Sequence, residues 1–188
     1  MGRVRRSGDG QTWVRAQRNA SAASSGAGKS VMLKLDSKHA EGIRQHALRD
    51  YPLECCGVLL GSAEGDWKWV VEVVPLPNLR SDPQRSGKVL PLEDPEHESA
   101  RSRYLIDPLD LLRVVKEART RSLEVVGYYH SHPDQPARPS THDRKLAWPG
   151  YSYLIATVEQ GKPGALTCWV LPADGDAFEP ENMELLQP

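Results

Sequence analysis

Short apolar runs alternate along this chain with two amphipathic helical patterns, and this alternation limits the folds open to it. A helix is predicted from Asp36 to Asp50, where small and branched apolar residues recur at helical spacing. A second is predicted after Asp107, a good N-cap residue, with Pro108 at its first position. The strand-like runs are MLKLD, GVLLG, WKWVVEVVPLPN, LEVVGYYHSHP, YSYLIATV and ALTCWVL, and the C-terminal AFEPENMELLQ fits an edge strand or a helix. This order predicts a single α/β sandwich rather than repeated βαβ units.

The ends of the domain are indicated by composition. The 188 residues suffice for one domain with a sizeable core. Residues 1–31 hold six basic side chains against one aspartate, a net charge of +5, and they are rich in Ser, Gly and Ala without periodicity. We expect a disordered leader there and a folded domain over 32–188. Residues 79–102 are charged and broken by Pro and Gly, which predicts a long mobile loop that could contact substrate.

Several locations and partners are disfavoured by the sequence. The chain has no run of 18 apolar residues, so no membrane span is expected. Its three cysteines, two of them adjacent, do not suit a disulfide framework, which favours a cytoplasmic protein. The formal net charge of −1 gives no general reason to expect nucleic acid, although the basic leader could bind it or an acidic partner.

The stretch GYYHSHPDQPARPSTHD joins a predicted strand end to a cluster of polar side chains. Residues i and i+2 on a strand point to the same face, so His130 and His132 can aim both imidazoles at one point. Asp143 would lie on the first turn of a helix that returns toward that strand end. Two imidazole nitrogens and one carboxylate oxygen are suitable zinc ligands, and three protein ligands leave a position for water.

The same residues also permit an interpretation without a metal. Ser140 and Asp143 have capping-box spacing, in which both would bond backbone N–H groups at a helix start. Histidines at a strand end can be ordinary surface residues. Glu54, in YPLECCGVLLG, is either a candidate general base beside a buried strand or a loop carboxylate near a helix end.

Together these residues resemble the motif of the JAMM (MPN+) zinc metalloprotease family, E…H-[ST]-H-P…S-x-x-D. Glu54, the quartet His130–Pro133, Ser140 and Asp143 all stand at the spacing of that motif. The flanking E-x-C-G and PLPN stretches also match the bacterial single-domain members. The resemblance covers about residues 32–172.

The resemblance implies a fold and a chemistry. The expected fold is the α/β MPN (JAMM) fold, a mixed β-sheet flanked by helices, similar to the cytidine-deaminase-like architecture. His130, His132 and Asp143 would bind one catalytic Zn²⁺, Glu54 would be the general base, and Ser140 would hydrogen-bond the oxyanion. The implied reaction is hydrolysis of an amide or isopeptide bond after the C-terminal Gly-Gly of a ubiquitin-like or sulfur-carrier protein.

Other functions were weighed against the hydrolase. Some members of the family have lost the metal ligands and are non-catalytic MPN scaffolds in protein complexes, whereas the ligand set of this chain is intact. A DNA-associated role rests on the basic leader alone. Cys56 could be a nucleophile only with a histidine beside it, and we expect a packed thiol instead.

Overall fold

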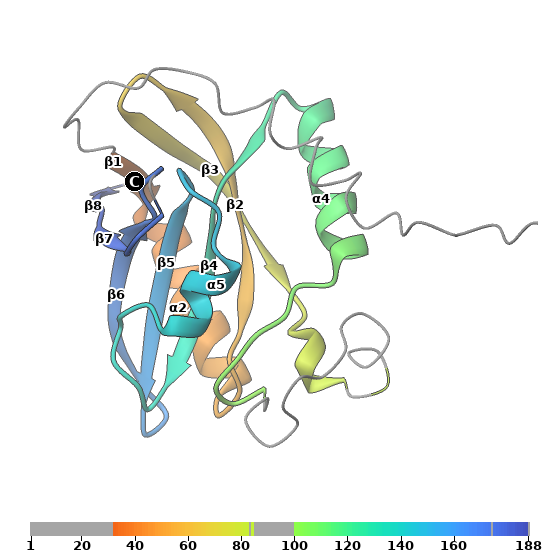
Figure 1. The fold of residues 1–188 in the computed structure, drawn as a ribbon, viewed down its shortest axis with the longest axis vertical. Coiled ribbons are helices and arrows are strands. Elements are labelled where there is room, and N and C mark those ends of the chain that lie inside the picture. Colours follow the sequence, from red (N-terminus) through yellow and green to blue (C-terminus); the bar gives the residue numbers. More distant parts are fainter. Residues whose placement is uncertain (1–31, 83, 85–99, 174, 188) are drawn as a thin grey trace, which may run out of the picture.

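The computed structural model describes residues 32–82, 84, 100–173 and 175–187, so the leader and most of the predicted 79–102 loop lie outside the described residues (Figure 1). The strands are β1 (Met32–Asp36), β2 (Cys56–Glu64), β3 (Trp67–Leu76), β4 (Glu124–Pro133), β5 (Ser152–Glu159), β6 (Lys162–Val170), β7 (Glu179–Pro180) and β8 (Asn182–Leu186). The helices are α2 (Ser37–Asp50), η1 (Leu79–Ser81), α4 (Pro108–Thr120) and α5 (Thr141–Leu146). Within the described ranges one mixed sheet has the order β7-β6-β5-β4-β2-β3-β1-β8, which confirms the predicted α/β class.

Both long helices begin where the sequence predicts. The Asp36 carboxylate accepts a hydrogen bond from the Lys38 backbone N–H at 2.8 Å and caps α2. Asp107 caps α4 in the same way, bonding the Leu109 N–H at 2.9 Å, with Pro108 at the first helical position. These caps satisfy backbone donors that a helix start leaves without partners.

The two long helices cover different parts of the sheet (Figure 1). The apolar residues of α2, Ala40, Ile43 and Ala47, pack into the larger core cluster. Those of α4, Val114 and Ala118, pack into a second cluster built on side chains of β2 and the end of β3. The sheet therefore carries a helix on each side, and α5 lies beside β5 at the end where the histidines of β4 are found.

The C-terminal segment forms two short strands, which settles the choice left open by its sequence. β7 pairs with β6 and β8 pairs with β1, at opposite ends of the sheet order, although only Glu181 separates them in the chain. The sheet must therefore curl until its ends approach. At the junction, the buried Glu181 carboxylate pairs with Lys68 of β3 at 3.1 Å, and Lys68 also donates to the Ser152 hydroxyl of β5 at 2.9 Å.

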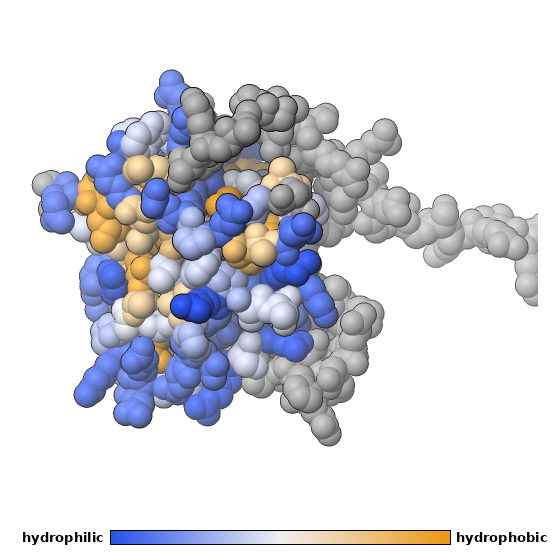
Figure 2. Space-filling view, turned by 60° about the vertical axis from the view of Figure 1, so that its left-hand side comes forward, coloured by the Kyte–Doolittle hydropathy of each residue, from blue (hydrophilic) through white to orange (hydrophobic). Residues whose placement is uncertain are grey.

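Among the described residues, no helix is long and apolar enough to cross a membrane. On the face drawn in Figure 2, hydrophobic patches are small and hydrophilic residues surround them. Scattered apolar surface of this kind is normal for a folded domain.

Candidate metal centre

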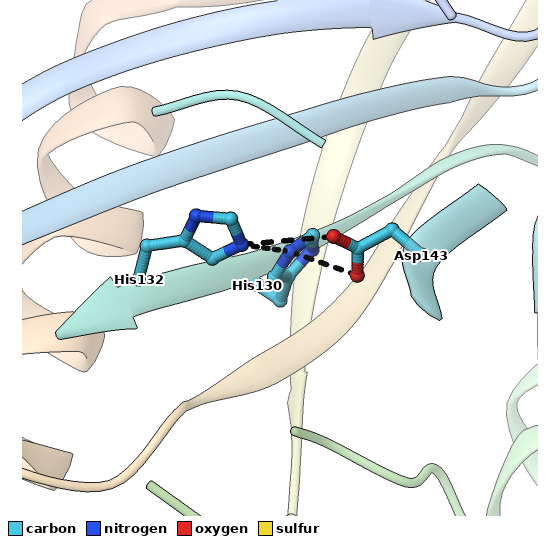
Figure 3. A group of neighbouring side chains, drawn as sticks. All are labelled: His130, His132 and Asp143. Carbon is cyan, nitrogen blue, oxygen red and sulfur yellow. Dashed lines mark hydrogen bonds and ion pairs between the residues drawn. The ribbon is translucent and has the colours of Figure 1, made fainter. Parts of the chain in front are cut away.

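His130 and His132 lie on β4 and Asp143 lies on α5, and the three side chains point at one another (Figure 3). The Nε2 atoms of the two histidines are 3.0 Å apart. Asp143 places Oδ1 3.4 Å from His130 Nε2 and Oδ2 3.7 Å from His132 Nε2. All three side chains are buried. The predicted ligand set is thus brought together from two elements, as its spacing suggested.

The separations suit a single zinc ion. Two ligand atoms bonded at about 2.0–2.1 Å in tetrahedral directions are about 3.3–3.4 Å apart. The two histidine nitrogens, 3.0 Å apart, lie near that separation, and Asp143 brings one carboxylate oxygen to 3.4 Å from His130 and the other to 3.7 Å from His132. Among the described residues, no other group of three His, Cys, Asp or Glu side chains brings its ligand atoms together in this way.

The protonation of the three groups also suits a cation. His132 Nδ1 lies 2.7 Å from the carbonyl oxygen of Pro136, which can only accept, so Nδ1 donates to it and Nε2 is the ring nitrogen that faces His130 and Asp143. Burial lowers the pKa of His130 and favours its neutral form. Burial by itself would raise the pKa of Asp143, but His130, when it is protonated, and hydrogen bonds from the two histidines and Ser140 hold that pKa well below its usual range. A divalent metal requires neutral imidazoles and an ionised carboxylate, and the pKa shifts of His130 and Asp143 favour these forms.

The strand that carries the histidines is fixed from both neighbours. β4 lies antiparallel to β2 and parallel to β5. A Cβ at Gly127 would collide with the Ser152 carbonyl oxygen, so glycine allows this close pairing. Ser131, between the two histidines, accepts a hydrogen bond from the Cys55 N–H at 2.8 Å and donates its own N–H to the Cys55 carbonyl at 3.1 Å. This pair of hydrogen bonds fixes Cys55, the residue after Glu54, relative to both histidines.

Glu54 lies in the extended segment before β2 and is 5% exposed. Its backbone N–H donates to the Ala100 carbonyl at 2.8 Å, and its carbonyl accepts from the Asn78 amide at 2.9 Å. Burial, and then the negative charge of Asp143, raise the pKa of the Glu54 carboxyl to about 9. A carboxyl so strongly perturbed beside a metal-ligand cluster is typical of an active site.

Glu54 also forms part of the wall of a cavity of about 510 Å³. The remaining wall comes from the end of α2, from Leu53, and from the segment Pro75–Ser81. The metal ligands do not line this cavity, but the charge of one of them, Asp143, acts on the Glu54 carboxyl. A carboxyl that borders a cavity and interacts with a metal ligand suits proton exchange with a reacting molecule.

Ser140 caps α5, as its capping-box spacing with Asp143 predicts. Its hydroxyl accepts from the Asp143 N–H at 3.1 Å and donates to Asp143 Oδ2 at 2.7 Å, and its backbone N–H reaches the same oxygen at 2.6 Å. Capping and metal binding are therefore not exclusive, because the capping box orients the Asp143 carboxylate toward the histidines. The side chain is exposed.

Tyr104 is part of the site, although the sequence motif did not predict it. Its ring stacks on the His130 imidazole with centroids 4.7 Å apart and 26° between planes. Burial raises the pKa of its hydroxyl well above the usual value, so the ring remains neutral. The residue belongs to no spacing pattern, and its nearness to the start of α4 is the only signal the sequence holds.

The cysteine prediction is confirmed. Cys56 is buried, and its Sγ lies 3.6 Å from the Leu76 carbonyl and 3.8 Å from that of Pro77. Burial raises the pKa of this thiol well above its usual value, which keeps it protonated. Cys56 is therefore a packed thiol with carbonyl neighbours and not an activated nucleophile.

Known proteins resemble this chain in sequence and in structure. A family model described as prokaryotic homologs of the JAB domain matches residues 36–172. The Desampylase of Haloferax volcanii is 33% identical over 115 residues, which are 61% of this chain and 69% of that protein. A Thermus thermophilus protein named "Probable TtuB-protein conjugate cleaving protease" is 36% identical over 115 residues, 61% of this chain and 63% of its own length.

Solved structures share the fold. The solution structure of a Desulfitobacterium hafniense protein has a TM-score of 0.65 and 33% identity, covering 84% of this chain and 94% of the other. The solution structure of a Salinibacter ruber protein has a TM-score of 0.57 and 33% identity, covering 84% and 92%. The match over residues 36–172 includes all five residues that the sequence predicts for the site.

Proposed function

Because this chain belongs to the family of prokaryotic JAB-domain proteins, whose model matches most of its length, we propose that it is a zinc-dependent hydrolase. It would cleave amide or isopeptide bonds after the C-terminal Gly-Gly of a ubiquitin-like or sulfur-carrier protein. The observation that carries the proposal is the convergence of His130, His132 and Asp143, whose ligand atoms lie within 4.8 Å of one another, with the buried Glu54 carboxyl subject to the charge of Asp143. The names of the two relatives support cleavage of ubiquitin-like conjugates as the reaction class.

His130, His132 and Asp143 are the residues that would hold the metal. Zinc bound there supplies a Lewis acid that polarises the substrate carbonyl and activates water. The three ligands carry one negative charge in the protonation state described above, and three protein ligands leave room for a further one. An intact ligand set favours this enzyme over a non-catalytic scaffold of the same fold.

Glu54 would move the proton. Burial and the charge of Asp143 raise the pKa of this carboxyl to about 9, and a nearby divalent cation lowers the pKa of a carboxyl. Glu54 would then accept a proton from the attacking water and deliver it to the departing amine. Its place in the wall of the cavity suits both transfers.

Ser140 would stabilise the oxyanion. Its hydroxyl proton now goes to Asp143 Oδ2, and the exposed side chain would turn that proton toward the substrate oxygen as negative charge develops there. A donor directed at an oxyanion is typically worth about 10²–10³ in turnover. The Asp143 N–H would keep its bond to the Ser140 oxygen throughout, so the helix cap survives.

The test is cleavage of fusions in which a ubiquitin-like protein ends in Gly-Gly before a reporter. We expect cleavage after Gly-Gly, loss of activity on chelation, and recovery when zinc is added back. A fusion with the terminal Gly-Gly changed to Ala-Ala is the control for the substrate. Zinc-loaded protein that leaves every ubiquitin-like fusion intact would refute the proposed function.

A further inference from the structure

The side chain of Asn78 is buried and uses its full hydrogen-bonding capacity. Nδ2 donates to the Glu54 carbonyl at 2.9 Å and to the Arg103 carbonyl at 3.2 Å, and it also lies 3.5 Å from the Ala100 carbonyl. Oδ1 accepts from the backbone N–H groups of Arg80 at 3.0 Å and Leu105 at 3.1 Å. A side-chain amide has two N–H donors and one oxygen with two lone pairs, so the four bonds satisfy it completely.

These bonds join three segments that are distant in sequence. They are the extended residues before β2, the η1 turn after β3, and residues 100–105. Two backbone hydrogen bonds link the same segments. The Glu54 N–H donates to the Ala100 carbonyl and the Leu79 N–H donates to the Leu105 carbonyl, both at 2.8 Å. The third segment carries Tyr104, whose ring stacks on His130.

We propose that Asn78 is a positioning residue, whose amide sets the backbone of Glu54 relative to the metal ligands and holds the Tyr104 segment against them. The inference rests on the proposed function, since it assigns Asn78 to the same reaction. Glu54 precedes the regular pairing of β2, which begins at Cys56. Its carbonyl accepts from Asn78, and its N–H donates to a segment that Asn78 also holds, so the Asn78 side chain influences both backbone groups of Glu54.

The expected effect follows from how sharply catalysis depends on placement. A displacement of about 1 Å in a positioned group can cost about 10²-fold in rate. In Asn78→Ala the Glu54 carbonyl loses its donor and the third segment loses two bonds. We expect kcat to fall about 10²-fold, with KM changed by less than about 3-fold and zinc content as in the parent.

Two variants accompany Asn78→Ala. Thr120→Ala removes a hydroxyl that donates to the Glu117 backbone carbonyl at 2.7 Å on α4, outside the bonds that hold Glu54. It should keep parental kcat. Asn78→Asp keeps the oxygen that accepts from Arg80 and Leu105 but replaces the amide donors, so it covers the case in which the alanine variant does not fold. Parental kcat in Asn78→Asp and Asn78→Ala alike would overturn the inference.

Coupling to Glu54 separates positioning from a general loss of structure. A residue that acts through Glu54 adds little once the basicity of Glu54 is gone. We therefore expect Asn78→Ala to lower kcat less than about 3-fold in a Glu54→Gln background, against about 10²-fold in the parent. The same factor in both backgrounds would mean that Asn78 acts independently of Glu54 and would overturn the inference.

A measurement without substrate distinguishes this inference from the proposed function. Amide hydrogen exchange of Glu54 reports its bond to Ala100. We expect that exchange to quicken at least about 10-fold in Asn78→Ala and to stay unchanged in Thr120→Ala. If no ubiquitin-like fusion is cleaved but exchange quickens, the proposed function fails and the positioning of Glu54 stands. If exchange is unchanged, Asn78 does not position Glu54, whatever the activity.

Discussion

Glu54→Gln should inactivate the enzyme and, in the absence of metal, make it more stable. Glutamine keeps the shape and hydrogen-bonding reach of the side chain but cannot accept the proton of the attacking water. General acid–base help is typically worth about 10²–10⁴-fold, so turnover should fall by at least that much. Zinc binding should persist, because Glu54 is not among the grouped ligand atoms.

The gain in stability follows from the pKa of the carboxyl. Burial raises this pKa from 4.5 to about 9 on folding, so between these values the folded chain binds a proton that the unfolded chain has released. The free energy of unfolding of the parent therefore falls as pH rises from 4.5 to 9. At pH 7, about 2.5 pH units above the unfolded pKa of 4.5, each unit costs about 1.4 kcal/mol, which makes the total roughly 3.5 kcal/mol. Glutamine, which does not titrate, is spared this cost.

The assay is urea unfolding of chelated parent and Glu54→Gln protein between pH 5 and pH 9, together with turnover and zinc content of the metal-loaded forms. The stability advantage of the variant should grow with pH, and zinc should reduce it by favouring the ionised carboxylate. Glu41→Gln, which changes an exposed carboxylate on α2, is the matched control. A stability difference that is independent of pH would refute the burial argument, near-parental turnover would place the base elsewhere, and loss of zinc would make Glu54 a ligand.

Four further variants test single features of the site and the core. His132→Ala should lower zinc content well below about one ion per chain, measured by metal analysis. Ser140→Ala should lower kcat about 10²-fold or more with zinc retained, beside a capping loss of about 0.5–2 kcal/mol in urea unfolding. Cys56→Ala should keep parental turnover in the fusion assay, since the thiol is buried and protonated. Lys68→Met should destabilise the fold by about 3–5 kcal/mol, because Glu181 then remains buried without its partner, and Lys68→Met with Glu181→Leu should recover much of that loss in the same urea titration.

The helices and central strands could be predicted because their signals are local. A capping aspartate, a proline at the first helical position, and alternation of apolar residues each act within a few residues. The metal ligands were predictable for the same reason. The i, i+2 spacing of His130 and His132 fixes their common face, and the capping box fixes the turn on which Asp143 stands.

The closure of the sheet could not be predicted, because it depends on a pairing between distant residues. Lys68 and Glu181 are 113 positions apart, and neither shows in its own surroundings that it is buried. Trp67 and Trp69 are a second case in which a contact depends on how strands pair. Both are more than a third exposed, and the Lys34 ammonium lies 4.0 and 4.2 Å from their ring centroids, an arrangement that follows from β1 lying beside β3.

The difference between local signals, which can be predicted, and contacts between distant segments, which cannot, is also found within the site. The residues that would perform chemistry follow a motif because their spacing is set by a strand and a helix start, whereas the residues that place them follow none. Asn78 and Tyr104 reach Glu54 and His130 from segments whose separation in the chain leaves no periodic trace. The five motif residues alone would therefore not reproduce the site in another chain. A graft that carries them without Asn78 and the 100–105 segment should still bind zinc, because the ligands lie on β4 and α5, but should leave Glu54 without the two backbone bonds that hold it.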